Sequence, residues 1–404
     1  MVGRITSHSM APHWLGPHYA VTCTHCGGKH SIALTADTAS EFVCSQCGTL
    51  QERDPQLKPQ LGDQVQLRSL VNKTPNSWNP KRFDVVVVST ADERSSEFAL
   101  SPDRQLREGT IKRVIGLPGE SLQFRYGDLF VDGQLVQKSW TDQLRQGVLV
   151  HRDQTRVSPI GWQSEGPVGW SRHHQGWIHR NPVQGKAGRL VYRHRRCVLT
   201  SQNLVPEAPI EDTLTYSQGR ARRLNPVSDL IIRGRVKLTP KSRLYCDLKT
   251  GAETIRVQWD TVSSQLQVDV PGRSQSISTP VALPDGEGLE MAISSFDRKV
   301  TVVHGDEIVL EADFSDVDYT SRREDYSSQP VNFHAEGDVE LSALSIFRDL
   351  HLVGPYGDEI RWELGRRLES DEYFLIGDHL AESIDSRTSG RGWSRSEMIA
   401  WVRQ

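Results

Sequence analysis

Short runs of β-branched and aliphatic residues, separated by tight turns, follow one another along most of this chain. Valines fill the run at 85–88, another run spans 110–115, and period-two runs recur at short spacing over 226–348. Such runs favour strands, and no long amphipathic helical pattern interrupts them. The 32 glycines and 20 prolines supply the turns that short strands require. We therefore predict a mostly β fold.

Turn-forming residues locate one group of strands in the sequence. The sequence Leu-Pro-Gly-Glu at 117–120 has proline and glycine at the central positions of a type II turn. Tight-turn residues at 126–128 and 132–133 then separate three short alternating runs. These features predict a β-meander over 121–136. In contrast, 140–225 shows no clear period, and we expect it to be irregular.

Length and charge limit the classes of function. A chain of 404 residues suggests two to four domains. The net charge of −3 excludes a polycation that coats nucleic acid, so we expect no nucleic-acid partner. No apolar run approaches the roughly 18 residues of a transmembrane helix, and residues 1–12 lack the apolar segment of a signal peptide.

Four of the six cysteines form two CxxC pairs, which are Cys23, Cys26, Cys44 and Cys47. The pairs are separated by 17 residues, and each is followed by glycine, as in a zinc ribbon. Four thiolates complete a tetrahedral shell, so the predicted zinc is structural. Two disulfides remain an alternative, and His25 and His30 are spare candidate ligands.

Three further segments contain residues suited to nucleophilic chemistry. The first is Ser-His-Ser-Met-Ala-Pro at 7–12, and the second is the strand-like 111–120 with Lys112 and Arg113 before Gly-Leu-Pro-Gly. The third is Gly-Asp at 377–378, followed by Ser-Ile-Asp-Ser-Arg at 383–387. A serine hydroxyl is a weak nucleophile until a base removes its proton. A neutral lysine amine can be that base, and burial on an apolar strand favours the neutral form.

In this order, the three segments resemble the signal peptidase I family of membrane-associated Ser/Lys endopeptidases. The family's motifs are Ser-x-Ser-Met-x-Pro, Lys-Arg-x-x-Gly-x-Pro-Gly-Asp, and Gly-Asp-Asn followed by Ser-x-Asp-Ser-Arg. The segments at 62–65 and 81–86 also look like family segments. The resemblance covers 3–14, 61–138 and 372–404, about a third of the chain.

The resemblance implies a role for each matching residue. Ser9 would be the nucleophile and Lys112 the general base. Ser7 would donate to the oxyanion beside the backbone N–H of Ser9, and Ser383 would orient the Lys112 amine. The remaining roles are an ion pair between Asp385 and Arg387, a carboxylate partner such as Asp378 for Arg113, and a shallow apolar substrate pocket lined by Ile5 and Met10.

The chain departs from the family pattern in two places. His379 stands where the family has asparagine after Gly-Asp, and we expect a surface or turn role for it. Only eight residues precede Ser9, where the family carries a transmembrane anchor. We therefore expect either that the true start lies upstream or that other contacts dock the protein on the membrane, and we favour the first.

The predicted fold is a signal-peptidase-like β catalytic core with an inserted zinc ribbon and an inserted β-sandwich. The predicted parts are the core at 1–20, 61–138 and 349–404, the zinc ribbon at 21–50, an irregular insertion at 139–225 and the β-sandwich at 226–348.

The resemblance implies that the chain removes N-terminal signal peptides from secreted preproteins, with small residues at the first and third positions before the cut. It implies a bacterial protein on the extracytoplasmic side of a membrane, with preproteins and a membrane surface or translocon as partners and no cofactor for catalysis. Two other classes stay open. One is a self-cleaving repressor-type Ser/Lys peptidase, and the other is an inactive or truncated signal-peptidase-like binding module in protein export.

Overall fold

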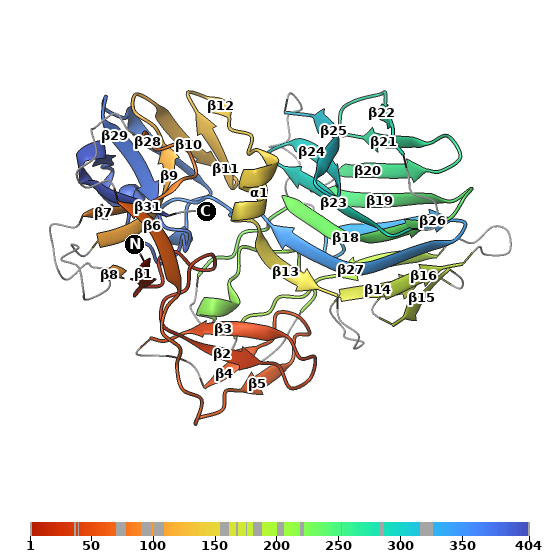
Figure 1. Ribbon diagram of the computed structural model, residues 1–404, viewed down its shortest axis with the longest axis horizontal. Coiled ribbons are helices and arrows are strands. Elements are labelled where there is room, and N and C mark those ends of the chain that lie inside the picture. The colour runs from red at the N-terminus through yellow and green to blue at the C-terminus, as the bar shows by residue number, and fades with distance from the viewer. Residues whose placement is uncertain are drawn as a thin grey trace.

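The computed structural model confirms a mostly β fold with three parts. In Figure 1 both chain ends lie in one part at the left, a small unit lies below it, and a large two-layered part lies at the right. The structure describes residues 2–35, 38, 40–69, 78–89, 98–100, 109–153, 161–166, 169–174, 176–180, 188–199, 206–218, 222–251, 253–282, 287–315 and 326–402.

The part with both chain ends is built on one sheet, which we name the core sheet. Its strand order is β30-β29-β9-β7-β31-β6-β1-β8, and β8 also pairs with β9, so six of the strands close on themselves. The strands are β1 (Val2–Ile5), β6 (Gln64–Ser69), β7 (Val85–Ser89), β8 (Phe98–Leu100), β9 (Gly109–Gly116), β29 (Glu372–Ile376), β30 (Trp393–Ser394) and β31 (Met398–Val402). The closure brings the first and last strands of the chain into one element.

A second sheet of four strands packs beside the core sheet. Its order is β12-β11-β10-β28, and its first three strands are the predicted meander. Gly119 has φ +82° in the turn before it, as the type II signature requires. Phe124, Leu352 and Phe374 are among the buried side chains between the two sheets. The strands are β10 (Ser121–Arg125), β11 (Asp128–Val131), β12 (Gln134–Leu135) and β28 (Arg361–Arg367).

The small unit consists of two hairpins over 18–52, and we name it the Cys unit. Each hairpin carries one CxxC pair. Gly27 and Gly48 follow the pairs with φ of +77° and +70°, and their N–H groups donate to the carbonyls of Cys23 at 2.8 Å and Cys44 at 2.7 Å. Only glycine adopts this backbone without strain. The strands are β2 (His18–Thr22), β3 (Lys29–Ala33), β4 (Glu41–Val43) and β5 (Leu50–Glu52).

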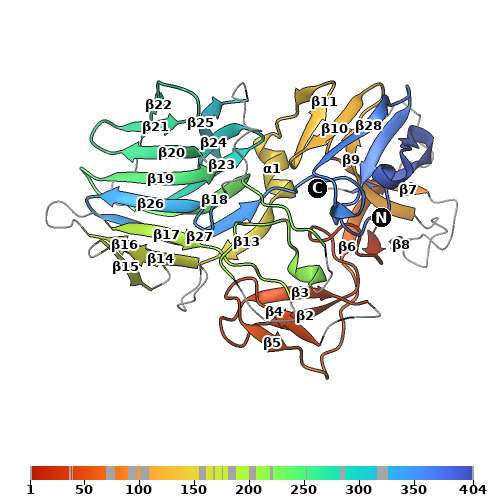
Figure 2. The same cartoon turned by 180° about the vertical axis from the view of Figure 1, so that it is seen from behind.

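The large part is two packed sheets over 148–348, and we name it the sandwich (Figure 2). One sheet has the order β15-β16-β27-β18-β23-β24-β25 with β13 on β27, and the other has the order β14-β17-β26-β19-β20-β21-β22. Trp259, Phe333 and Ile293 are fully buried in the core between them.

The first sheet contains β13 (Val148–Arg152), β15 (Trp170–His173), β16 (Gly176–His179), β18 (Leu230–Leu238), β23 (Leu289–Phe296), β24 (Lys299–His304), β25 (Glu307–Asp313) and β27 (Val339–Arg348). The second contains β14 (Gly161–Glu165), β17 (Arg189–Arg193), β19 (Arg243–Thr250), β20 (Glu253–Asp260), β21 (Gln265–Asp269), β22 (Ile277–Pro280) and β26 (Val331–Glu336).

The prediction of an irregular segment at 139–225 is wrong for much of its length. The segment contains the helix α1 (Trp140–Gln146) and the five strands β13 to β17. Strands β13 and β16 pair with β27, and β17 pairs with β26, so the sandwich begins near residue 148 rather than at 226. All four residues of β16 are buried, so this strand lacks the alternation by which a half-exposed strand is recognised.

A buried ionic cluster joins the sandwich to the rest of the protein. Lys138 Nζ donates to Asp297 Oδ1 at 2.7 Å and to Asp349 Oδ2 at 2.8 Å. Burial alone would lower the pKa of Lys138, but the two carboxylates outweigh it and hold that pKa above its usual range. Because the chain leaves the core at Lys138 and returns at Asp349, the cluster fixes both crossings. Among the described residues, no helix is long and apolar enough to cross a membrane.

Candidate active site

Ser9 lies in the loop after β1 and is only 5% exposed. The Ser7 hydroxyl donates to Ser9 Oγ at 3.3 Å, and the Ser9 N–H donates to Ser7 Oγ at 3.4 Å. The Ser9 carbonyl in turn accepts from the backbone N–H of His379 at 2.9 Å. The two serines of the first motif are thus in direct contact, and the C-terminal motif holds the backbone of Ser9.

Lys112 occupies the middle of β9, where all eight residues are buried. The strand lies between β7 and β29, and Lys112 is opposite Val86. The lysine is 0% exposed, and its Nζ donates to Ser383 Oγ at 3.1 Å. The β-branched strand therefore places this amine in the interior, beside the serine that the sequence predicted as its partner.

Gly377 joins the serine side of the site to the lysine side. A Cβ atom at this position would lie 2.2 Å from Ser383 Oγ and 2.4 Å from the Ser9 carbonyl oxygen. The backbone N–H of Ser383 also donates to the carbonyl of His379 at 2.9 Å. One turn thus touches both Ser9 and Ser383, and the structure brings Ser7, Ser9, Lys112 and Ser383 to a single site.

A buried ion pair fixes this turn to β9. Arg113 donates from Nε to Asp378 Oδ1 at 2.7 Å and from Nη2 to Oδ2 at 2.6 Å. His13 Nδ1 lies 2.8 Å from Asp378 Oδ2. Burial would raise the pKa of Asp378, but Arg113 and then His13 outweigh it and hold that pKa far below its usual range. Asp378 therefore stays ionised and ties the serine loop, β9 and the turn together.

The Ser-x-Asp-Ser-Arg segment is held by a second buried pair. Arg387 donates to Asp385 from Nε at 2.9 Å and from Nη2 at 2.7 Å. Asp385 also accepts from the N–H of Gly377 at 3.0 Å and caps the short helix α2 (Ser386–Ser389). Burial raises the pKa of Asp385, but Arg387 more than compensates, so the pKa lies below its usual value. This pair shapes the backbone that carries Ser383.

Ile5 and Met10 lie under the serine loop. Both are fully buried in a cluster with Val65, Val87 and Ile111. Their side chains support the loop from the interior of the core sheet. The predicted contact of Ile5 and Met10 with a substrate stays a prediction.

A second set of contacts around Ser9 was not predicted from the sequence. His8 Nδ1 is hydrogen-bonded to the Tyr216 hydroxyl at 2.6 Å, and His379 Nε2 to Ser217 Oγ at 2.8 Å. Tyr216 and Ser217 belong to the 3-10 helix Thr215–Ser217 inside the segment predicted to be irregular. His379 is buried rather than at the surface, because this helix covers it. Only the position of His8 inside the serine motif could have drawn attention to these contacts.

The four paired cysteines converge in the Cys unit. Their Sγ atoms all lie within 4.8 Å of one another, and the pairs Cys23–Cys47 and Cys26–Cys44 are each separated by 3.6 Å. None of the six cysteines forms a disulfide. A tetrahedral zinc with Zn–S bonds of about 2.3 Å separates its sulfur ligands by about 3.8 Å. The donor set and its spacing therefore fit zinc, and the spare candidate ligands His30 and His25 contact Cys44 and Cys47.

Residues 56–164 match the model of the family described as signal peptidase, peptidase S26. The match contains Lys112, Arg113 and the strands β7 and β9, while Ser9 and Ser383 lie outside it. This match supports a signal-peptidase-like protein. The matched family is membrane-associated and acts on preproteins with signal peptides. No curated protein matches the chain.

Several solved β structures resemble part of the chain. A galectin from Caenorhabditis elegans, LEC-6, is 9% identical over 30% of this chain and 83% of its own, with a TM-score of 0.23. A protein of unknown function with a galectin-like fold from Bacillus subtilis is 7% identical over 50% of this chain and 97% of its own, with a TM-score of 0.32. Scores this low support no conclusion about fold or ligand.

Proposed function

We propose that this chain is a serine endopeptidase that removes N-terminal signal peptides from secreted preproteins, with Ser9 and Lys112 as its catalytic dyad. One observation carries the proposal. The Lys112 amine is fully buried 3.1 Å from Ser383 Oγ, and the turn at Gly377 connects Ser383 directly to Ser9. The family match over 56–164 supports the same reaction class.

The reaction follows from the positions of these groups. The Lys112 amine, as general base, takes the proton of the Ser9 hydroxyl, and Oγ attacks the scissile carbonyl carbon. The Ser7 hydroxyl and the Ser9 N–H, which lie 3.4 Å apart, stabilise the developing oxyanion. The Lys112 ammonium then gives its proton to the leaving amine. A water molecule, deprotonated by Lys112, attacks the acyl carbonyl, and the Lys112 ammonium returns this proton to Ser9 Oγ as the acyl group leaves, while the hydrogen bond to Ser383 keeps the amine oriented.

The family suggests the substrate and the setting. We propose that the substrates are signal peptides with small residues at the first and third positions before the cut, as the resemblance to the family implies. We further propose that the catalytic part faces the extracytoplasmic side, near a membrane surface or translocon.

We also propose that the four clustered cysteines hold a structural zinc ion. Four protein ligands leave no open coordination position, so the ion would take no part in peptide hydrolysis. Its effect is on the shape of the Cys unit. Leu34, next to β3 of this unit, accepts a hydrogen bond from His8 at 3.0 Å, so the unit reaches the serine loop.

The test is cleavage of a purified preprotein in detergent by the full chain, by Ser9→Ala and by Lys112→Ala. We expect cleavage at the signal-peptide junction that falls by at least a thousandfold in both variants, as in other nucleophile–base pairs. Matched controls are Ser274→Ala and Lys58→Ala, which change exposed residues outside the site and should leave the rate unchanged. Cleavage that persists in Ser9→Ala would overturn the proposal, and preprotein binding without any cleavage would support the inactive binding module instead.

A further inference from the structure

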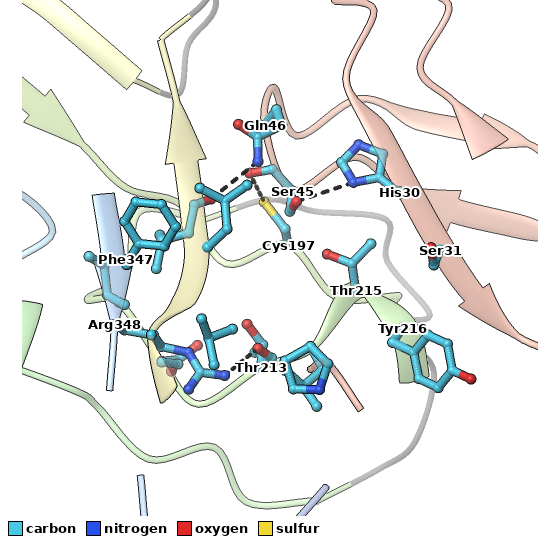
Figure 3. Close-up of a pocket in the computed structure, with 18 of the residues that line it drawn as sticks. His30, Ser31, Ser45, Gln46, Cys197, Thr213, Thr215, Tyr216, Phe347 and Arg348 are labelled. Atoms are coloured by element: carbon cyan, nitrogen blue, oxygen red, sulfur yellow. Dashed lines mark hydrogen bonds between the residues drawn. The ribbon is translucent and has the colours of Figure 1, made fainter. Parts of the chain in front are cut away.

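A cavity of about 390 Å³ lies where the serine loop, the Cys unit and the sandwich meet (Figure 3). The serine loop contributes Pro12 and His13, and the Cys unit contributes Ser31 among others. The far wall comes from the end of β27, with Arg348, and from the segment with Tyr216. The volume is within the range of small-ligand sites in proteins, which begins at about 300 Å³.

Arg348 is an unusual residue for a cavity wall. It is 3% exposed, and its guanidinium donates to the backbone carbonyls of Asp349 and Thr213, each at 2.8 Å. Among the described residues, no carboxylate forms an ion pair with it. Burial lowers the pKa of Arg348 to about 10, which still leaves it positively charged at pH 7. A buried charge is normally paired, so this one has capacity for an anionic partner.

The nearest carboxylates already have other cationic partners. Asp349 accepts from Lys138 at 2.8 Å, and Asp212 accepts from Arg222 at 3.0 Å. Glu211 is the one acidic residue among the described residues on the cavity wall, and Arg196 donates to it from Nε at 2.7 Å. The charge that remains available to a ligand is therefore positive.

The rest of the wall suits a carboxylate attached to an aliphatic chain. Leu15, Val148 and Phe347 supply apolar surface, and the hydroxyls of Ser31 and Thr215 supply polar groups nearby. Figure 3 shows Arg348 at one end of the cavity with its bond to Thr213, and Ser31 across from it. An acidic side chain offers both parts, a charged end and a short apolar stem.

The cavity is also next to the proposed nucleophile. Pro12 and His13 follow Ser9 in the same loop, and His13 contacts Asp378, which adjoins Gly377. An extended chain advances about 3.3–3.4 Å per residue. Because the lining residue Pro12 is only three residues after Ser9, an extended substrate at Ser9 would need only a few residues to bring a side chain to this wall.

We propose that this cavity is a carboxylate subsite, in which Arg348 binds an aspartate or glutamate side chain of the polypeptide substrate. The inference rests on the proposed peptidase function and adds a specificity determinant to it. An acidic residue within a few positions of the cut would then strengthen binding.

The first test measures binding to the full chain carrying Ser9→Ala, so that no cleavage intervenes. Fluorescent peptides spanning a signal-peptide junction carry one glutamate, stepped through the positions on both sides of the cut, and each is paired with its glutamine equivalent. We expect glutamate to bind roughly tenfold more tightly at one or two positions, as for a charge-assisted hydrogen bond. Equal affinities at every position would overturn the inference.

Substitutions in the cavity then test whether Arg348 causes the glutamate preference. In the Ser9→Ala background, Arg348→Gln should abolish the preference for glutamate while glutamine peptides still bind. The matched control is Arg180→Gln, an exposed arginine on the sandwich, which should keep the preference. Because Arg348 also holds two backbone carbonyls, Ser31→Leu is a second variant that fills the cavity without changing the arginine, and it should remove the same preference.

Two further measurements separate the possible failures. Preprotein cleavage by the active chain with no glutamate preference would leave the peptidase function standing and reject the subsite. A glutamate preference in binding, without cleavage by the active chain, would leave the subsite standing and reject the peptidase function. A third outcome is that free glutarate binds the wild-type protein but not Arg348→Gln, while the peptides show no glutamate preference. The cavity would then bind a small-molecule carboxylate, and the proposal that it binds a substrate side chain would be rejected.

Discussion

The two halves of the proposed dyad are held in different ways. Lys112 is fixed within the core, in the middle of a fully buried strand paired on both sides, with its amine bonded to Ser383. Ser9 lies in a loop, and its neighbour His8 bonds to Leu34 beside the Cys unit and to Tyr216 from the sandwich segment. The base therefore depends on the core, whereas the position of the nucleophile also depends on both other parts of the protein.

This difference suggests what the two added parts do for the site. The 3-10 helix Thr215–Ser217 reaches both sides of Ser9, since its Tyr216 contacts His8 and its Ser217 contacts His379. A change in the Cys unit or the sandwich can thus reach the nucleophile without disturbing the lysine. Four predictions test this contrast.

The largest loss of activity is expected at Gly377, where the serine side and the lysine side of the site are in contact. Gly377→Ala would place a Cβ 2.4 Å from the Ser9 carbonyl and 2.2 Å from Ser383 Oγ, so the serine and lysine sides must separate. We expect kcat/KM for a preprotein to fall by at least about a thousandfold, or about 4 kcal/mol. The control is Ser274→Ala, because this exposed residue lies in the sandwich and outside the site. Near wild-type activity in Gly377→Ala would mean that the turn does not position the dyad.

The second prediction concerns the anchor of the turn. Asp378→Asn leaves buried Arg113 without its ionised partner and should lower the free energy of unfolding at pH 7 by about 3 kcal/mol. The folded pKa of Asp378 is depressed, so its stabilisation is present above the unfolded value of about 3.9 and is lost as pH falls towards the folded value.

The measurement is denaturant unfolding from pH 7 down to about pH 2. The gap between wild type and Asp378→Asn should be constant near neutral pH and shrink below about pH 4. The exposed Asp358→Asn variant should show no gap at any pH. A gap that widens in acid would contradict the assignment.

Local patterns in the sequence predicted the elements whose structure is determined by neighbouring residues. The turn at 117–120, the meander after it and the two CxxC hairpins were recognisable because glycine and proline fix their backbones locally. The strand with Lys112 was recognisable from its β-branched residues. The mostly β fold was confirmed on this basis.

Pairing between strands that are far apart in the chain could not be predicted from local sequence patterns. Strand β29 lies beside β9 although some 260 residues separate them, and only that pairing puts Ser383 next to Lys112. The resemblance to a family predicted the contact, but the residues alone did not. Strands β13 to β17 were missed because aromatic and basic residues interrupt their period, and the contact of Tyr216 with His8 has no local signal at all.

The third prediction tests the Cys unit. Removing the proposed zinc with a chelator should loosen the unit, raise the number of thiols that react rapidly by four, and release one zinc per chain. We expect a smaller fall in kcat/KM, about tenfold, because only the His8 side of the serine loop is affected. Cys23→Ser should reproduce the loss, whereas Cys246→Ala, buried in the sandwich, should not. Full activity after metal release would show that the nucleophile does not depend on this unit.

The smallest effect should come from one hydroxyl group. Tyr216→Phe removes the 2.6 Å contact with His8 and keeps the ring, so we expect kcat/KM to fall about fivefold, near 1 kcal/mol. Hydrogen exchange should become faster in the loop at 7–15 and stay unchanged in β9, because this strand is fully buried and paired on both sides within the core. The exposed Tyr356→Phe variant serves as the control. Faster exchange in β9 as well would mean that the base, like the nucleophile, depends on the sandwich, and the contrast between the two halves would not hold.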